Sequence, residues 1–428
     1  MNIMRYGSRG AQVQLLQLAL NRAGFPAGAT DGIFGAATQS ALRSFQAANG
    51  LAADGVAGPR THAALEPWYT GYRMHTVRPG DTLYRLAGTS GSTVRAIEIA
   101  NPGIDPMNLR PGSSIVVPFG FPVVPTTIDY GSELIRYCCR GLAARYPCIR
   151  RGELGKSVMG KPLYTLALGS GENRVFYNAS HHANEWITTP VLLRWCEELS
   201  RAFAFGGSVY GQDAGELLTA ASVCLAPAIN PDGIDLVTGD LTGGAYYIGA
   251  QSIAADYPAV PFPSGWKANI LGTDLNLQYP AGWSRAREIK FAQGYISPAP
   301  RDFVGAAPLS APESRAVYEF TLQYSPALTL SYHTQGNIIY WKYLDFEPEG
   351  SRVIAYRFAQ SSGYAVEETP YASGFAGYKD WFIQDFDRPG YTIEAGLGVN
   401  PLPMSQFEGI YAANIGILTI GLTATAQI

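Results

Sequence analysis

VFYNASHHANE, residues 175–185, joins a short apolar run to the side chains with the strongest chemical signal in this 428-residue chain. Val175–Ala179 has the composition of a buried β-strand, and His182 and Glu185 follow it with two residues between them. At this spacing an imidazole nitrogen and a carboxylate oxygen can turn toward one point, and zinc accepts both as ligands. The stretch therefore predicts a strand that ends at a metal site.

A third metal ligand has to come from elsewhere, and the chain contains five histidines: His62, His75, His181, His182 and His333. His62 and His75 lie in segments that resemble separate N-terminal modules, and His181 adjoins His182, so that their side chains should diverge. His333 remains, at the end of a second strand-like segment. For an isolated His-x-x-Glu pair, structural histidines are the commoner explanation. Two histidines and one glutamate with an open position form a hydrolytic zinc site.

Composition places the chain among globular proteins of two or three domains, with 47% hydrophobic and 15% charged residues. A net charge of −3 without a basic run predicts that nucleic acid is not a partner. The N-terminus shows no basic patch followed by an apolar segment, so we expect no secretory signal. Residues 409–428 carry no charge but are too polar for a membrane span, and they predict a buried helix instead.

Two related segments near the N-terminus are 23 residues apart: Asp31–Gly35 with Thr38, and Asp54–Gly58 with Thr61. Each precedes a helical pattern, because an aspartate and a glycine form the tight turn that starts a helix. Together with a first helix upstream, the pattern resembles the three-helix peptidoglycan-binding domain. We expect this domain to cover residues 1–68.

The next segment opens with HTVRPGDTL, residues 75–83, and closes with LRPGSSIVVP, residues 109–118. Both ends resemble the LysM domain. The resemblance implies a βααβ fold over residues 72–119 that binds the sugar backbone of peptidoglycan or chitin.

Residues 126–428 follow a proline-punctuated linker and alternate apolar, strand-like runs with helical periods. This alternation predicts an α/β domain with a mixed central sheet flanked by helices, and sites in such sheets gather at strand ends. Glu394 ends one of the apolar runs, Gly390–Glu394. A carboxylate in so apolar a segment needs a function or an ion-pair partner, which makes Glu394 the candidate base.

Five motifs occur in the order of one known family: His182-x-x-Glu185-Trp186, Asn230-Pro231-Asp232-Gly233, Gly272–Asn276, Ser331-Tyr332-His333 and Thr392-Ile393-Glu394. They resemble the zinc carboxypeptidase (M14) family from about Ile128 onward. The resemblance implies that His182, Glu185 and His333 hold one zinc ion per chain. It also implies that Glu394 is the general base and acid.

Several positions depart from that family's pattern. Asn276 is kept as a substrate-binding residue, but the arginine that usually follows it is Leu277. A leucine cannot replace the planar clamp that an arginine forms on a carboxylate. Lys267 stands where the family has its oxyanion-stabilising arginine, after Trp266.

Two further substrate-binding positions are implied downstream. Tyr371 matches the tyrosine that covers the substrate, and Lys379 falls where the family sets its side-chain preference. A lysine at that position would favour an acidic substrate group. A solvated surface lysine is the alternative.

The combination of modules resembles bacterial γ-D-glutamyl-(L)-meso-diaminopimelate peptidases. It implies a hydrolase whose partners are the glycan strands and stem peptides of peptidoglycan. Two alternatives stay open: a metallocarboxypeptidase that trims C-terminal residues, and a wall-binding adaptor without activity. The site of action also stays open between the wall, the spore and the cytoplasm.

Overall fold

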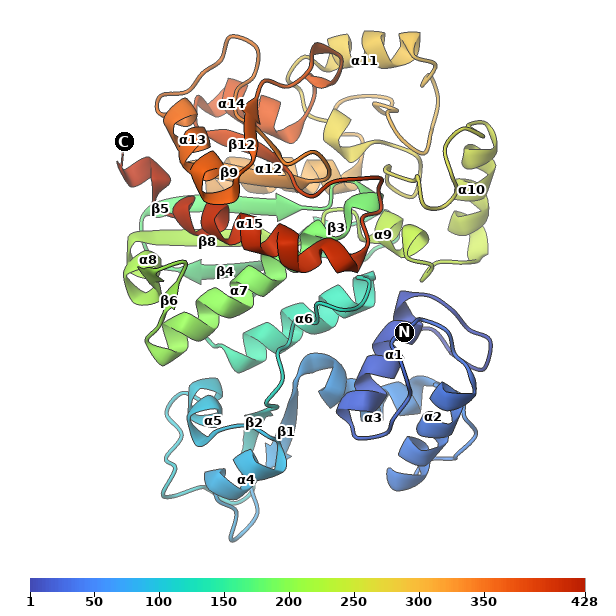
Figure 1. The fold of residues 1–428 in the computed structure, drawn as a ribbon, viewed down its shortest axis with the longest axis vertical. Coiled ribbons are helices and arrows are strands. Elements are labelled where there is room, and N and C mark those ends of the chain that lie inside the picture. Colours follow the sequence, from blue (N-terminus) through green and yellow to red (C-terminus); the bar gives the residue numbers. More distant parts are fainter. Residues whose placement is uncertain (428) are drawn as a thin grey trace. The chain divides into compact units, whose positions relative to one another are not determined.

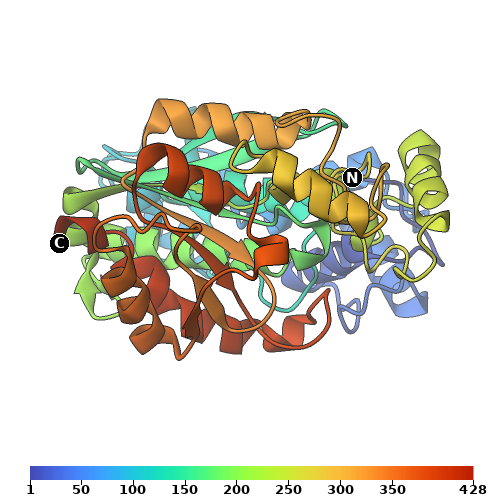
Figure 2. The ribbon, with the colours of Figure 1, turned by 90° about the horizontal axis from the view of Figure 1, so that it is seen from above.

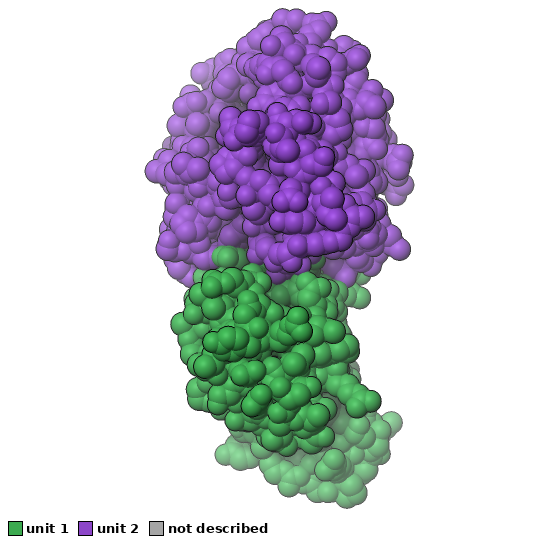
Figure 3. All heavy atoms as spheres, turned by 90° about the vertical axis from the view of Figure 1, so that its right-hand side faces the viewer, with its two compact units in different colours: residues 1–151 green, residues 152–428 purple. Residues whose placement is uncertain are grey.

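The structure is a computed structural model in which residues 1–427 are described. It divides into two compact units, residues 1–151 and residues 152–428 (Figure 3). Among the described residues, no helix combines the length and the apolar character needed to cross a membrane.

The first unit begins with three helices, α1 (Ala11–Arg22), α2 (Ala36–Ala48) and α3 (Pro59–Thr70). The turn before α2 is held by Gln17, whose Nε2 donates to Asp31 Oδ1 at 2.9 Å and to Thr38 Oγ1 at 3.1 Å. Gln17 Oε1 accepts from the backbone amide of Gly32 at 3.0 Å. A φ of 74° at Gly32 explains why this position is a glycine.

The turn before α3 repeats this arrangement around Gln46. Its Nε2 donates to Asp54 Oδ1 at 2.9 Å and to Thr61 Oγ1 at 3.2 Å, and its Oε1 accepts from the Gly55 amide at 2.9 Å. The repeated Asp-Gly and Thr of the sequence thus surround a buried glutamine in each copy. Two glutamines that the sequence pattern does not single out therefore organise both turns.

A βααβ module follows, built from β1 (Tyr72–Thr76), α4 (Leu83–Thr89), α5 (Val94–Ala100) and β2 (Ser114–Pro118). The two strands pair antiparallel. Thr82 and Thr93 begin the two helices, and each hydroxyl accepts from a backbone amide of the first turn. The first unit also contains α6 (Ser132–Arg145). The expected domain boundaries at residues 68, 72, 119 and 126 stay predictions.

The second unit is built on an eight-stranded sheet with the order β11-β10-β12-β9-β5-β8-β4-β3. Its strands are β3 (Arg150–Lys156), β4 (Pro162–Gly169), β5 (Asn173–Ala179), β8 (Ala221–Ala226), β9 (Leu328–His333), β10 (Ile338–Tyr340), β11 (Ala365–Glu367) and β12 (Gly390–Glu394). The four central strands, β12, β9, β5 and β8, run parallel. The remaining regular elements are α7 (Thr188–Phe205), β6 (Ser208–Val209), β7 (Gln212–Asp213), α8 (Ala214–Ala220), α9 (Pro231–Val237), α10 (Gly244–Ala255), α11 (Trp283–Ala292), α12 (Pro312–Tyr324), α13 (Ser351–Ser362), α14 (Tyr378–Phe386) and α15 (Phe407–Ile420).

Helices cover both faces of this sheet (Figures 1 and 2). Phe176 on β5 points to one face, where its ring lies 5.0 Å from that of Phe320 on α12. Its neighbour Tyr177 points to the other, where its ring lies 5.7 Å from that of Trp195 on α7 and its hydroxyl donates to the carbonyl of Leu418 on α15. Such alternation is what a strand buried on both faces requires. The predicted α/β class with a mixed, helix-flanked sheet is confirmed, as are the helical and βααβ modules before it.

The parallel direction of the central strands decides where the candidate site lies. The carboxyl ends of β5, β8, β9 and β12 meet at one edge of the sheet. Polar loops at this edge of a doubly covered sheet are the usual place for a site. His182 and Glu185 follow β5, while His333 and Glu394 are the last residues of β9 and β12.

Candidate metal centre and substrate pocket

The metal loop begins where the chain leaves β5. Ser180 takes a φ of 54°, and a short 3-10 turn, Ala183–Glu185, follows with His182 at its N-cap. This turn brings the two side chains of the His-x-x-Glu pair together. His182 Nδ1 lies 3.1 Å from Glu185 Oε2, and both residues are buried.

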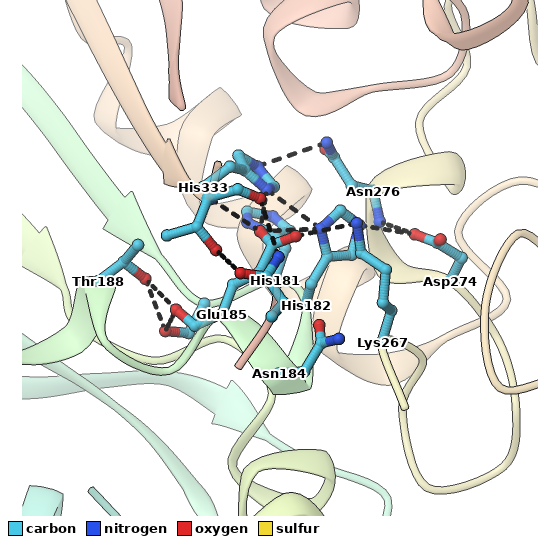
Figure 4. A network of polar contacts seen from close by, with 12 residues as sticks. His181, His182, Asn184, Glu185, Thr188, Lys267, Asp274, Asn276 and His333 are labelled. Carbon is cyan, nitrogen blue, oxygen red and sulfur yellow. Dashed lines mark hydrogen bonds and ion pairs between the residues drawn. The ribbon is translucent and has the colours of Figure 1, made fainter. Parts of the chain in front are cut away.

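His333 completes a compact triangle of ligand atoms (Figure 4). Its Nδ1 lies 3.0 Å from Glu185 Oε2 and 3.2 Å from His182 Nδ1. With zinc–nitrogen bonds of about 2.0 Å, tetrahedral ligands are separated by about 3.3 Å. The three atoms are therefore spaced like the ligands of one zinc ion, and the cluster is able to hold a metal.

The outer partners of the cluster orient its ligands. Asp274 Oδ1 accepts a hydrogen bond from His182 Nε2 at 3.1 Å, which leaves Nδ1 of that ring with a lone pair for a metal. Burial favours the neutral acid, but His182 and its hydrogen bond more than offset burial and hold the pKa of Asp274 below its usual value. The backbone amide of Thr334 donates to Glu185 Oε2 at 3.3 Å.

The other histidines take structural positions. His181 is not part of the triangle: its Nε2 lies 3.0 Å from the hydroxyl of Tyr279, and its ring stacks against that of His333 with the centroids 5.9 Å apart. Burial lowers the pKa of His181 well below its usual value, which keeps the ring neutral. In the first unit, His62 lies on α3, and His75 lies on β1 with its Nε2 2.7 Å from Asp81 Oδ2.

Asn230 holds the backbone around the metal loop. Its Nδ2 donates to the carbonyl of His181 at 3.1 Å and to that of Ala268 at 2.9 Å. Its Oδ1 accepts from the backbone amide of Gly233 at 3.0 Å and so begins α9. The Asn-Pro-Asp-Gly motif thus ties the loop after β5 to the segment that carries Lys267.

Lys267 lies beside the cluster, with its Nζ 2.9 Å from Glu185 Oε1. Burial alone would lower the pKa of this lysine, but the Glu185 carboxylate raises it above its usual value. The ammonium group therefore stays charged at the edge of the metal centre.

Glu394 ends β12 directly beside His333 in the parallel pairing of β12 with β9. Its carboxylate lines the pocket, and among the described residues no hydrogen bond or ion pair engages it. Burial raises the pKa of Glu394 to about 8, and the nearby Glu185 carboxylate adds to this shift. A carboxylate that is uncommitted and readily protonated has the properties of a general base and acid.

One pocket of about 230 Å³ is lined by His182, Lys267, Asp274, His333 and Glu394. The three substrate-binding residues expected from the sequence differ in their placement. Asn276 lines the pocket, and the Tyr378 backbone amide donates to its Oδ1 at 3.0 Å, so its Nδ2 faces His333. Lys379 also lines the pocket, but its Nζ is bound at 2.6 Å by Asp380 Oδ1 and by the carbonyl of Lys342.

Tyr371 is not among the residues that line the pocket. Its side chain is 60% exposed, and its hydroxyl accepts from Arg285 Nε at 3.2 Å. The ring packs edge-on against Phe375 with the centroids 5.0 Å apart. A covering role for Tyr371 stays a prediction that requires this segment to move.

Sequence reasoning missed three charged residues of the pocket, Lys290, Arg301 and Asp302. None of them lies in a motif: Lys290 is on α11, and Arg301 and Asp302 lie in the segment between α11 and α12, so only tertiary packing brings them to the pocket. Asp274 lies within the Gly272–Asn276 motif, but the sequence predicts no role for it. An aspartate two residues before the retained Asn276 was the one available signal for it.

The chain matches known families along most of its length. A model described as zinc carboxypeptidase (peptidase M14) matches residues 135–414, one for a peptidoglycan-binding domain matches residues 9–65, and the LysM model matches residues 75–118. Gamma-D-glutamyl-L-diamino acid endopeptidase 1 of Lysinibacillus sphaericus is 39% identical over 294 residues, which are 69% of this chain and 72% of that protein. Protein YqgT of Bacillus subtilis (strain 168) is 40% identical over 278 residues, 64% of this chain and 72% of that protein.

A solved structure shares the fold of the chain. Carboxypeptidase A from Helicoverpa armigera superposes with a TM-score of 0.55 at 18% identity, covering 80% of each chain. At this identity the similarity shows a shared fold and nothing about substrate.

Proposed function

The chain belongs to the zinc carboxypeptidase (M14) family, and we propose that it cleaves peptidoglycan stem peptides between the γ-carboxyl of D-glutamate and the following diamino acid. The observation that carries the proposal is the identity of 39% to a relative named for this bond, over 72% of that relative's length. As a family member the chain is a zinc peptidase, and its buried His-Glu-His cluster fits that metal.

The position of Leu277 supports an endopeptidase over an exopeptidase. This side chain touches the pocket, yet it is only 8% exposed and packs within a core cluster that includes Tyr279 and Tyr378. An arginine fork at this position would clamp the terminal carboxylate of an exopeptidase substrate. The pocket has a leucine embedded in the core instead.

We assign the metal to His182, Glu185 and His333. When bound there, zinc supplies Lewis acidity that activates water and polarises the scissile carbonyl. Glu394 accepts the proton of the attacking water and passes it to the leaving nitrogen. Lys267 places a positive charge where the carbonyl oxygen gains negative charge.

The two N-terminal modules support a polymeric wall substrate. Both match families that bind peptidoglycan or carry the LysM fold. Tethering to the glycan raises the local concentration of stem peptides at the pocket without any new catalytic contact.

The test is mass spectrometry of defined tripeptide and tetrapeptide stems after incubation with the wild type and with Glu394→Gln. The proposal expects a product that ends in D-glutamate from the wild type alone. Release of the C-terminal residue instead would show that the chain is a metallocarboxypeptidase and would overturn the proposal. No hydrolysis by a chain that carries stoichiometric zinc would leave the wall-binding adaptor.

A further inference from the structure

The pocket is lined by four basic side chains, and three of them are already neutralised within the protein. Lys267 Nζ lies 2.9 Å from Glu185, Lys290 Nζ lies 2.6 Å from Asp302 Oδ1, and Lys379 Nζ lies 2.6 Å from Asp380. The side chains of these lysines are 18%, 8% and 4% exposed. Lys290 and Lys379 are buried in their ion pairs, and Lys267 is held against Glu185 at the metal centre, so none of the three is left to bind a free carboxylate of the substrate.

Arg301 differs from all three. Its Nε bonds Asp302 Oδ2 at 2.5 Å, while no described residue engages its two terminal nitrogens. Its side chain is 43% exposed on the pocket wall. Asp302 is shared between Arg301 and Lys290, so this group of three carries one net positive charge.

The loop that carries Arg301 is attached to the metal centre. The Asp302 backbone amide donates to Asp274 Oδ2 at 3.1 Å, and the other oxygen of Asp274 accepts from the ligand His182. On the other side of Arg301, the carbonyl of Pro300 accepts from the backbone amides of Lys267 and Ala268 at 2.8 and 2.9 Å. These bonds fix the backbone on both sides of Arg301 relative to the candidate metal centre.

We propose that Arg301 is a specificity-determining residue that binds a free carboxylate of the peptide substrate through its two terminal nitrogens. A planar guanidinium forms two parallel bonds with a carboxylate, which a lysine cannot do. Arg301 thereby supplies, from a different loop, the charge that Leu277 cannot. The inference rests on the proposed function and names the group by which this pocket selects its substrate.

A stem peptide offers this carboxylate from two places. A γ-linked D-glutamate keeps its α-carboxylate beside the scissile bond, and the diamino acid carries a carboxylate on the other side. Amidation of either group removes one candidate at a time. Recognition of the glutamyl α-carboxylate would also explain selection of the γ linkage, because an α-linked glutamate has no free carboxylate at that position.

The experiment measures kcat and KM for Arg301→Gln and Arg301→Lys on a stem tripeptide and on two amidated forms of it, one blocked at the glutamyl α-carboxylate and one at the carboxyl groups of the diamino acid. Zinc content and the thermal midpoint serve as folding controls, and Arg287→Gln is the matched variant. Arg287 is exposed on α11, stacks over Trp283 and Phe291, and does not line the pocket. We expect Arg301→Gln to raise KM by about 10- to 100-fold with little change in kcat, because a charged hydrogen-bond pair is lost. Arg301→Lys should recover part of this loss.

Amidation at the recognised carboxylate should weaken the wild type to the level of Arg301→Gln, and the variant should be indifferent to it. If the wild type cuts the γ-D-glutamyl bond but Arg301→Gln keeps its KM on all three peptides, Arg301 has no such role and the proposed function stands. A kcat loss of equal size on all three peptides would also overturn the inference. If the wild type does not cut that bond, the proposed function itself is wrong and the inference falls with it.

Discussion

His182 Nε2 lies 3.1 Å from Asp274 Oδ1, and the second oxygen of the same carboxylate accepts the backbone amide of Asp302 at 3.1 Å. One buried aspartate therefore contacts a proposed metal ligand and anchors the loop that carries Arg301. We expect this arrangement to link metal affinity to the shape of the proposed substrate pocket.

Replacing this aspartate tests the link. We expect Asp274→Ala to weaken zinc binding by about 10- to 100-fold, because His182 loses the partner that fixes its tautomer. Competition with a chromogenic chelator measures the affinity. Asp256→Ala, at the exposed end of α10, is the control and should bind zinc like the wild type. An unchanged affinity in Asp274→Ala would show that the Asp274 contact does not support the metal.

The metal ligands make a simpler prediction. His333→Ala should lose stoichiometric zinc, since two of three ligand atoms cannot form the site, and activity should disappear with the metal. Elemental analysis of the purified variant measures the zinc content. His75→Ala, a substitution in the first unit, should keep one zinc per chain. A full zinc complement in His333→Ala would exclude His333 as a ligand.

Glu394 should be separable from metal binding. Glu394→Gln removes the proton acceptor but keeps the shape of the side chain, so we expect kcat to fall by about 10²- to 10⁴-fold with zinc content unchanged. Glu367→Gln on β11 is the matched control and should keep its kcat. A Glu394→Gln enzyme with activity close to that of the wild type would require another base.

A substitution at Gly233 tests how tightly α9 packs against the loop that carries His182 and Glu185. A Cβ at this position would lie 2.7 Å from Ala183 Cβ, 2.7 Å from Asn230 Oδ1 and 2.8 Å from the carbonyl of Ala268. Gly233→Ala should therefore destabilise the chain and displace the loop, with a lower thermal midpoint and weaker zinc binding. At Gly243 a Cβ meets nothing within 4 Å, so Gly243→Ala should have little effect. Equal midpoints for the two variants would contradict this account.

The buried His62 should make the free energy of unfolding of the first unit depend on pH. Burial lowers the pKa of this histidine below its usual value of 6.5, and the ring is held between the Tyr69 hydroxyl and the Asn2 carbonyl. The N-terminal ammonium also disfavours the charged ring, while Glu133 partly opposes this effect. As the pH falls below about 6.5, the unfolded chain binds a proton that the folded state resists, so the free energy of unfolding decreases.

Denaturant unfolding at pH 7.5 and pH 5.5 measures this effect. The wild type should lose more stability between the two pH values than His62→Gln, which cannot titrate. His75→Gln provides the comparison for a histidine in the same unit. The same pH dependence in the wild type and in His62→Gln would assign the effect to other groups.

Local patterns predicted much of this protein, because they depend on interactions between residues close in the chain. The apolar run Val175–Ala179 is a strand, and the two-residue gap between His182 and Glu185 is closed by a single 3-10 turn. The scarcity of histidine pointed to His333, and an acidic residue ending an apolar strand pointed to Glu394. Apart from the histidine count, which needs the whole chain, each of these signals can be read from fewer than ten consecutive residues.

Tertiary structure alone decided the charge of the pocket. The sequence predicts that Lys379 offers a positive charge to the substrate. In the structure, Asp380 and the Lys342 carbonyl bind its ammonium group instead. Tyr371 is in contact with Arg285 rather than at the pocket. Arg301 belongs to no motif, yet loop packing places it on the pocket wall with two nitrogens uncommitted.

The physical reason is that the identity of an ionisable residue fixes its charge but not its partner. Partners come from contacts between segments far apart in the chain, such as the bond of the Asp302 amide to Asp274. The spacing of His182 and Glu185 is local, so the sequence alone could predict a zinc centre there. The sequence could not show that Arg301, rather than one of the lysines, keeps terminal nitrogens free for a substrate carboxylate. That depended on how the segments pack in the tertiary structure.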